Sequence, residues 1–271
     1  MHLSPEIIAS AEAIQEIRRN IHAHPELRFE ENRTADLVAE ALSSWGITVY
    51  RGMGKTGVVG RLDGDLGPGK MIGLRADMDA LPLQEHNNFA HASKNPGKMH
   101  ACGHDGHTAM LLGAAQYLSN HRDFKGTVIF IFQPAEEGVY NDKGETILAG
   151  AELMVKEGVL ENPKVDVIFG LHVTATSDNG VIEYKPGATM AAVDQLDIKV
   201  KGKQAHGASP WTGIDPIVIS SQIVMGLQTI VSRSVNITED PAIVTVGAIH
   251  SGIRQNIIPE SSHMIGTIRT F

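Results

Sequence analysis

The chain has 271 residues, of which 42% are hydrophobic, 20% charged and 5% aromatic, a composition typical of folded globular proteins. The 31 acidic residues outnumber the 23 basic ones, and the formal net charge of −8 argues against a protein that binds nucleic acid or an anionic membrane. The one cysteine excludes an internal disulfide framework and fits a reducing compartment. No apolar run is long enough to span a membrane and no secretory signal is recognisable, so we expect a cytoplasmic protein.

Predicted helices and strands alternate along the first 186 residues. Ser4 and Pro5 mark the start of an amphipathic helix that should end before Pro25, because serine is favoured at the N-cap and proline in the first turn. The pattern then predicts, in chain order, a helix at about 34–45, strands at 48–50, 57–62 and 71–76, a helix at 106–120, a strand at 127–132, a helix at 146–157 and a strand at 165–173. The last two strands are continuous apolar runs, typical of strands covered on both faces. This alternation predicts an α/β domain over residues 1–186, with a mostly parallel mixed sheet flanked by helices.

The pattern changes near Lys185. Half-buried strands are predicted at 195–200, 242–249 and 264–270, with a long helix at about 215–233 between the first two. The β-α-β-β order predicts a smaller α+β domain over residues 187–271.

The strongest chemical signal is the histidine-rich stretch at 99–107. Cys102 and His104 are one residue apart, so both side chains can point the same way in an extended turn. A thiolate and an imidazole together suit zinc or another borderline transition metal. The alternative for this stretch alone is a solvated loop that holds histidines by chance.

Three other predicted strands also end in residues that bind metals. Glu136 and Glu137 follow the strand at 127–132, His172 ends the strand at 165–173, and Asp77 and Asp79 follow the strand at 71–76. Each alone has an ordinary explanation, as a charged loop or a satisfied core histidine. Ligands of open α/β sheets collect at the carboxyl ends of the strands. Together these strand ends predict one metal centre at that edge of the sheet, with room for two ions.

A weaker signal lies in the second predicted domain. His206 stands among small residues in a turn at 202–211, which suggests close approach to another group, although a surface histidine is the ordinary explanation. Asn256 belongs to a similar polar turn at 255–259.

These stretches resemble a known family. The chain is similar to the aminoacylase/carboxypeptidase-type dinuclear metallohydrolases, and within them to the amidohydrolase branch that includes hippurate hydrolases, N-acyl-amino-acid amidohydrolases and plant auxin-conjugate hydrolases. The matching segments are residues 18–27, 75–82, 99–107, 133–138, 170–172, 202–210 and 266–271. The resemblance implies a phosphorylase/peptidase-type catalytic domain and a smaller ferredoxin-like lid domain, which would also form a homodimer.

The resemblance also implies roles for individual residues. The metal ligands would be Cys102, His104, Glu137 and His172, for two divalent ions of zinc, manganese, cobalt or nickel. Glu136 would be the general base and Asp79 would support a ligand, whereas Asp77 stands where many relatives have a ligating histidine. In the lid, His206 would reach the active site of the partner subunit and Asn256 would help to hold the substrate.

The implied reaction is hydrolysis of the amide bond of an N-acyl amino acid. Family members are longer, however, and return after the lid to the catalytic domain to supply a last metal-binding histidine. The sequence reaches only a lid strand at Phe271, so we expect the lid to be incomplete here. Neither His250 nor His263 can replace that ligand, because both fall in the lid stretch. One alternative is thus a catalytically impaired remnant that binds a metal or ligand, and another is a related carboxypeptidase or dipeptidase. The acyl and amino-acid preferences and the identity of the metal stay open.

Overall fold

The computed structural model describes residues 4–140 and 146–271, and the chain divides into two units, Met1–Ser177 and Asp178–Phe271. The division falls nine residues before the predicted domain limit at residue 186. The limit itself stays a prediction, because both positions lie in the connection between the last strand of the first unit and the first strand of the second.

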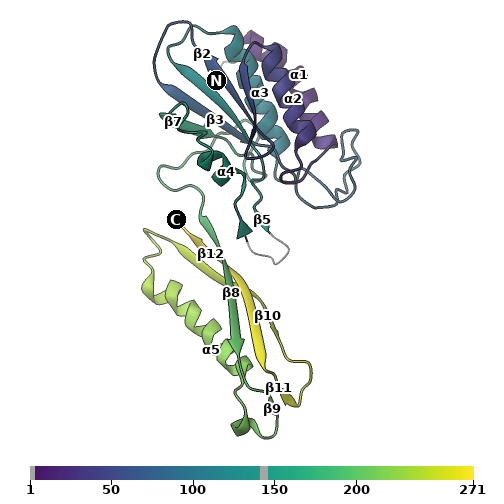
Figure 1. Cartoon of the computed structure of the whole chain (residues 1–271), viewed down its shortest axis with the longest axis vertical. Helices are drawn as coiled ribbons and strands as arrows, with labels where there is room; N and C mark the ends of the chain where they lie inside the picture. The colour runs from purple at the N-terminus through teal and green to yellow at the C-terminus, as the bar shows by residue number, and fades with distance from the viewer. Residues whose placement is uncertain (1–3, 141–145) are drawn as a thin grey trace. The chain divides into compact units, whose positions relative to one another are not determined.

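The first unit is built on a five-stranded mixed sheet (Figure 1). Its strands are β1 (Thr48–Met53), β2 (Gly57–Asp63), β3 (Met71–Asp77), β4 (Thr127–Gln133) and β7 (Val167–Gly170), in the spatial order β1-β2-β4-β3-β7. The β1–β2 and β2–β4 pairings are antiparallel, whereas β3 pairs in parallel with both β4 and β7. The mixed sheet is confirmed, although parallel pairings make up half rather than most of those in this sheet.

Three helices cover one face of this sheet (Figure 1). They are α1 (Pro5–Ala23), α2 (Asn32–Ser44) and α3 (His104–Asn120), and Ser4 caps α1 by accepting from the amide of Ile7. Helix α4 (Gly150–Lys156) contributes Met154 to a smaller apolar cluster that holds Ile129 and Ile131. Two short strands, β5 (Val139–Tyr140) and β6 (Thr146–Ile147), pair with each other before α4.

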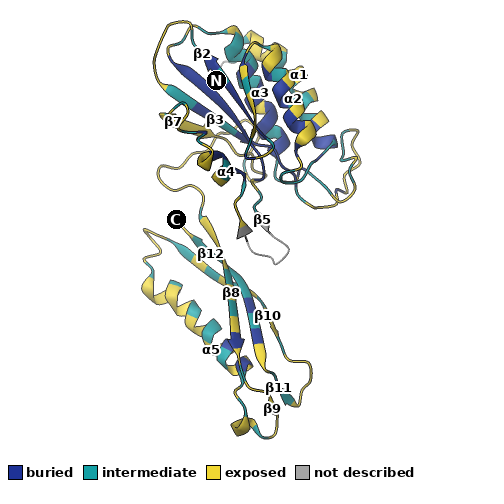
Figure 2. Cartoon of the chain, in the orientation of Figure 1, coloured by how far each residue is buried: buried dark blue, intermediate teal, exposed yellow. Residues whose placement is uncertain are grey.

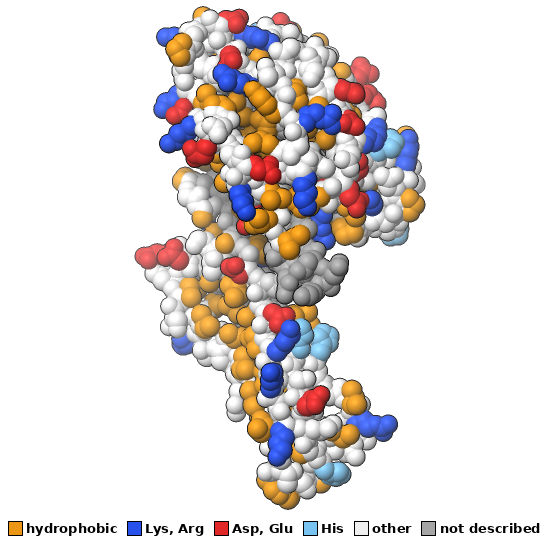
Figure 3. Space-filling model, viewed as in Figure 1, with side chains coloured by type: hydrophobic (Ala, Val, Ile, Leu, Met, Phe, Trp, Pro, Cys, Tyr) orange, Lys and Arg blue, Asp and Glu red, His pale blue; other side chains and the backbone are white. Residues whose placement is uncertain are grey.

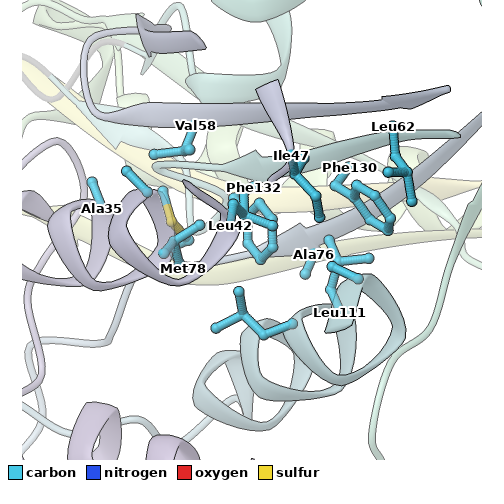
Figure 4. Packing of buried hydrophobic residues seen from close by; sticks show 14 of the residues in the cluster. Ala35, Leu42, Ile47, Val58, Leu62, Ala76, Met78, Leu111, Phe130 and Phe132 are labelled. Atoms are coloured by element: carbon cyan, nitrogen blue, oxygen red, sulfur yellow. The ribbon is translucent and has the colours of Figure 1, made fainter. Parts of the chain in front are cut away.

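Strand β4 lies at the centre of both apolar clusters. Phe130 and Phe132 face α2 and α3 and pack with Leu42 and Met78 (Figure 4), while Ile129 belongs to the cluster with α4. All seven residues of β4 are buried, and Figure 2 shows much of the interior of this sheet in dark blue. The continuous apolar run at 127–132 therefore correctly predicted a strand covered on both faces.

Two predictions for the first unit were wrong. The run at 165–173 forms only the four-residue strand β7, and it is exposed rather than buried because it pairs only with β3 at the edge of the sheet. The helix predicted at 146–157 begins only at Gly150, since Thr146 and Ile147 form β6 and Ala149 is still extended.

The second unit has the predicted β-α-β-β order. Its three-stranded antiparallel sheet has the order β10-β12-β8, from β8 (Ala192–Lys201), β10 (Ala242–Ser251) and β12 (Ser261–Thr270). Helix α5 (Pro216–Thr229) packs on this sheet and continues into a π-helical turn, Ile230–Ser234, and a short 3-10 helix spans Pro210–Thr212. A pairing that the sequence did not predict joins β9 (Ala205–His206) to β11 (Ile257–Ile258).

On the face shown in Figure 3, acidic and basic side chains are interspersed over the first unit. No continuous basic patch is visible there, in keeping with the net charge of −8. Among the described residues, no helix is both long and apolar enough to cross a membrane.

Candidate metal centre

The carboxyl end of β3 places two buried carboxylates beside the start of α3. Asp77 and Asp79 are 0% and 1% exposed. His107 donates from Nδ1 to Asp77 Oδ1 at 2.6 Å, and the Arg75 guanidinium lies 2.8 Å from Asp77 Oδ2. Burial by itself would raise the pKa of Asp77, but the hydrogen bond from His107 and the charge of Arg75 outweigh it and lower the pKa to about 2. Asp77 is therefore an ionised carboxylate.

His104 is oriented as a metal ligand would be. Its Nδ1 lies 2.8 Å from the backbone oxygen of Asp79, and since a carbonyl only accepts, Nδ1 carries the proton. The other ring nitrogen, Nε2, is buried and has no hydrogen-bond partner among the described residues. It lies 3.6 Å from Asp77 Oδ2, 3.8 Å from Glu136 Oε2 and 3.9 Å from Glu137 Oε1. Nε2 thus faces a cluster of carboxylates. Burial by itself would lower the pKa of His104, but the hydrogen bond with Asp79 and the nearby charges of Asp77 and Glu136 outweigh it and raise the pKa to about 8, so Nε2 is available to a cation once that cation displaces its proton.

The residue before His104 must be glycine. Gly103 has a φ of 90°, in the left-handed region, and a Cβ there would lie 2.3 Å from Cγ2 of Val173. This close approach brings the segment after β7 against the start of α3. Cys102 Sγ consequently lies 3.5 Å from Nε2 of His172.

His172 is held in the same way as His104. Its Nδ1 donates to the backbone oxygen of Val173 at 2.6 Å, which leaves Nε2 facing Cys102. The amide of Val173 donates to His107 Nε2 at 2.9 Å, so the chain Asp77–His107–Val173 ties the end of β3 to this segment. His107 is a positioning residue that the sequence analysis did not single out.

Glu136 and Glu137 reach the cluster from the loop after β4. Their amides donate to Asp79 Oδ1 and Oδ2, at 3.0 and 3.1 Å. The predicted supporting residue Asp79 therefore contacts both this loop and His104.

Among the residues that the structure describes, three groups of side chains have ligand atoms close enough to share a cation: Cys102, His104 and His172; Asp77, His104 and His107; and His104, Glu136 and Glu137. Glu137 Oε1, like His104 Nε2, is buried without a hydrogen-bond partner in the part of the chain that the structure describes. Two such atoms 3.9 Å apart, with a thiol and further carboxylates nearby, fit a divalent cation between them.

The electrostatics of the cluster point the same way. Burial and the charges of Glu137 and Glu136 raise the pKa of the Cys102 thiol to about 12, so without a cation it stays protonated. Burial and the charges of Asp77 and Glu137 likewise raise the pKa of Glu136, despite the opposing effect of His104. A neighbouring dication would offset this excess of negative charge and stabilise the Cys102 thiolate.

The two predicted site residues of the second unit lie side by side. His206 in β9 pairs with Ile257, and the amide of Gly207 donates to the backbone oxygen of Asn256 at 2.8 Å. The amide of Ala208 donates to His206 Nδ1 at 3.1 Å, which leaves the Nε2 side of the ring as the one that can donate. The catalytic and substrate-binding roles of His206 and Asn256 stay predictions.

Comparison with known proteins assigns the family. The model of peptidase family M20/M25/M40 matches residues 73–262, which include every predicted metal ligand. The chain belongs to this family. One relative, the N-acyl-L-amino acid amidohydrolase of Geobacillus stearothermophilus, is 47% identical over 94% of the chain and 66% of its own length.

Two other relatives carry different names. Thermostable carboxypeptidase 1 of Saccharolobus solfataricus is 45% identical over 95% of the chain and 63% of its own length, and the hippurate hydrolase of Campylobacter jejuni is 44% identical over 99% and 67%. The YxeP protein of Bacillus subtilis, described as a dinuclear metal-binding M20 peptidase, superposes with a TM-score of 0.79 at 39% identity, over 97% of this chain and 65% of that one. The chain thus spans about two thirds of the length of these relatives.

A second buried polar cluster lies behind the start of α3. His22 donates to Asp105 Oδ2 at 2.7 Å and contacts Glu85 Oε1 at 3.1 Å, while Arg18 Nε lies 2.7 Å from the same oxygen of Asp105. The hydrogen bond to Asp105 raises the pKa of His22 above 6.5, although burial opposes it. Burial would raise the pKa values of Asp105 and Glu85, but their hydrogen bonds, including those from His22, outweigh it and lower them.

This His22 cluster predicts a pH-dependent stability. A histidine whose folded pKa is raised stabilises the fold fully below its ordinary pKa of 6.5, and this contribution is lost as the pH rises through the folded value. The carboxyl groups of Asp105 and Glu85, whose folded pKa values are lowered, stabilise the fold fully at pH values above their ordinary pKa values of 3.8 and 4.5. This stabilisation is lost as the pH falls through the folded pKa values. We expect the contribution of the cluster to be greatest between pH 4.5 and 6.5.

The measurement is the urea unfolding midpoint of the wild type and of His22→Gln as a function of pH. The difference between the unfolding midpoints of the wild type and His22→Gln should become smaller as the pH rises above 6.5. His24→Gln, at the adjacent C-cap of α1, is the control and should leave the pH profile unchanged. A difference that is constant or grows above pH 6.5 would contradict the assignment.

Proposed function

We propose that the protein hydrolyses the amide bond of N-acyl amino acids with the help of a divalent cation held by Cys102, His104, Glu137 and His172. The observation that carries the proposal is the convergence of His104 Nε2 and Glu137 Oε1, which have no hydrogen-bond partner within residues 4–140 and 146–271, with Cys102 and His172 at one edge of the sheet. The 47% identity to an N-acyl-L-amino acid amidohydrolase supports the choice of substrate class.

Glu136 is the general base in this proposal. Its side chain is 41% exposed, which leaves it accessible to water and substrate, and Oε2 lies 3.8 Å from His104 Nε2. Its raised pKa suits a group that takes a proton from the attacking water and delivers it to the leaving amine. A divalent cation held by Cys102, His104, Glu137 and His172 would supply Lewis-acid chemistry, by polarising the scissile carbonyl and acidifying water.

The other residues orient the reacting groups. Asp79 holds His104 and the loop of Glu136 and Glu137, while His107 and Asp77 hold the segment that carries His172. His206, whose Nδ1 is taken up by the Ala208 amide, would donate from Nε2 to the developing oxyanion or to the substrate carboxylate, and Asn256 would help to hold the substrate.

Further features rest on the family resemblance. We infer two ions per site, of zinc, manganese, cobalt or nickel, because the mixed thiol, imidazole and carboxylate donors accept any of them. The same resemblance supports a homodimer formed through the second unit, and the single cysteine fits a cytoplasmic location.

A carboxypeptidase is the second candidate, since a relative with that name is 45% identical. Both activities release an amino acid that has a free carboxylate, and they differ in whether the acyl side is a simple acid or a peptide. A panel of N-acetyl and N-benzoyl amino acids beside N-blocked dipeptides separates them.

The test of the proposal combines turnover with metal binding. The chain is stripped with a chelator, reloaded with one of the four metals, and assayed on this panel. We expect hydrolysis of N-acyl amino acids to be lost on stripping and restored by metal, and His104→Ala to lose the metal while the control His24→Ala keeps it. Metal binding without turnover would support the impaired remnant. If the chain shows no metal binding and no turnover, the proposal is overturned.

A further inference from the structure

The loop that carries Glu136 and Glu137 is fixed through three consecutive backbone amides. Two of them donate to Asp79, as described above. The third, that of Ala135, donates to Glu31 Oε1 at 2.8 Å, across 104 residues of sequence. Ala135 is 0% exposed and has a φ of 46°, a conformation that residues other than glycine rarely adopt. Its surroundings must therefore hold it there.

Glu31 is itself completely buried. It is 0% exposed at the N-cap of α2, and its second oxygen accepts a hydrogen bond from the Thr56 hydroxyl at 2.5 Å. Burial raises its pKa, so keeping a carboxyl group at this position is costly unless its contacts are needed. The sequence-based assignment gives Glu31 no role.

The packing around the loop makes Glu31 difficult to replace. Gly150 lies so close that a Cβ would be 1.7 Å from the backbone oxygen of Pro134, and a Cβ on Gly57 would be 3.1 Å from Pro134 Cδ. The loop cannot move toward these glycines. Without the Glu31 carboxyl group, the buried Ala135 amide would lose its acceptor.

We propose that Glu31 is a positioning residue that holds the backbone at Ala135 and so places Glu136 and Glu137 in the metal centre. The inference rests on the proposed function, because it concerns the loop that carries the proposed base and one proposed ligand. Together, Glu31 and Asp79 bind all three successive amides of this loop.

The test compares Glu31→Ala with the conservative variant Glu31→Gln. Glutamine keeps an oxygen that can accept from Ala135, and its amide group can donate to the Thr56 hydroxyl, whereas alanine keeps neither contact. Leu42→Ala is the matched control, since it truncates a fully buried side chain on the same helix that belongs to the core cluster.

Two readouts do not depend on turnover. The first is hydrogen exchange at the Ala135 amide, measured relative to the Phe130 amide in β4. The second is titration with Co²⁺ alone, followed by the absorption of the bound ion. We expect Glu31→Ala to speed the relative exchange and to weaken Co²⁺ binding about 10-fold, as is typical when support for a metal ligand is lost. Glu31→Gln should restore both, and Leu42→Ala should change neither. If the wild type turns substrate over, kcat should fall in Glu31→Ala while KM stays the same.

The outcomes separate the two proposals. If the wild type binds no Co²⁺, the proposed function fails, and exchange at Ala135 still decides whether Glu31 holds the loop. If Glu31→Ala keeps both the protected amide and the wild-type affinity for Co²⁺, the role of Glu31 is overturned. Should Glu31→Ala not fold, Glu31→Asp takes its place under the same criteria, because its shorter side chain cannot keep both contacts.

Discussion

Replacing Glu136 by glutamine should reduce kcat for N-acyl amino acid hydrolysis about 1,000-fold, the middle of the range for loss of a general base. Glutamine keeps the size of the side chain but cannot accept the proton of the attacking water. The structure gives Glu136 no hydrogen bond through its carboxylate among the described residues, so the change removes little besides the base. The measurement is kcat and KM on metal-loaded protein, with metal content determined for each sample.

The matched control is Glu157→Gln, a glutamate that caps α4 and whose carboxylate accepts from the amide of Gly54. It should keep wild-type turnover. Full activity of Glu136→Gln with the metal retained would exclude Glu136 as the base. Loss of metal from this variant would instead mark Glu136 as a ligand.

Replacing Phe130 by alanine should lower the free energy of unfolding of the first unit by about 4 kcal/mol, as is typical for truncating a buried phenylalanine. Phe130 is 0% exposed in the central strand β4 and lies in the main core cluster with Leu42 and Ile47 (Figure 4). The loss combines the removed apolar contacts with the cavity that is left, because the surrounding side chains of α2 and α3 can close it only in part.

The measurement is urea unfolding followed by tryptophan fluorescence. The chain has two tryptophans, and a Trp211→Phe background leaves Trp45, which packs against this core, as the reporter of the first unit. Ile168→Ala is the control, since its side chain is 46% exposed on β7 and its loss should cost only about 0.5 kcal/mol. Equal losses in the two variants would contradict the assigned core.

The elements that the sequence predicted well are those with a local cause. Ser4 and Pro5 start α1 through capping, and the apolar run of β4 is long enough to require burial on both faces. The late start of α4 has a tertiary cause instead, because Gly150 packs against Pro134, where any side chain would clash. The exposure of β7 depends on its place at the edge of the sheet, which its own apolar sequence does not show.

In the candidate site, too, the sequence predicted the residues that have a local signal and missed those that depend on tertiary contacts. Cys102, His104, Glu136, Glu137 and His172 could be found because each follows or ends a recognisable strand or begins a helix. His107 and Glu31 could not be found in this way, since each acts through a partner far away in the sequence, Asp77 and the Ala135 amide. A buried glutamate such as Glu31 looks like any surface acid of a helix start until the fold shows what it contacts.

The contacts of Asp79 have a consequence for the choice of ion. One carboxylate binds the amides of Glu136 and Glu137, and the backbone oxygen of the same residue orients His104. The proposed ligands Glu137 and His104 are therefore attached to a common anchor and cannot separate freely to suit a larger ionic radius. Discrimination by ion size is thus expected to originate in this anchor, whereas the exposed His172, on a different segment, is the donor most able to adjust.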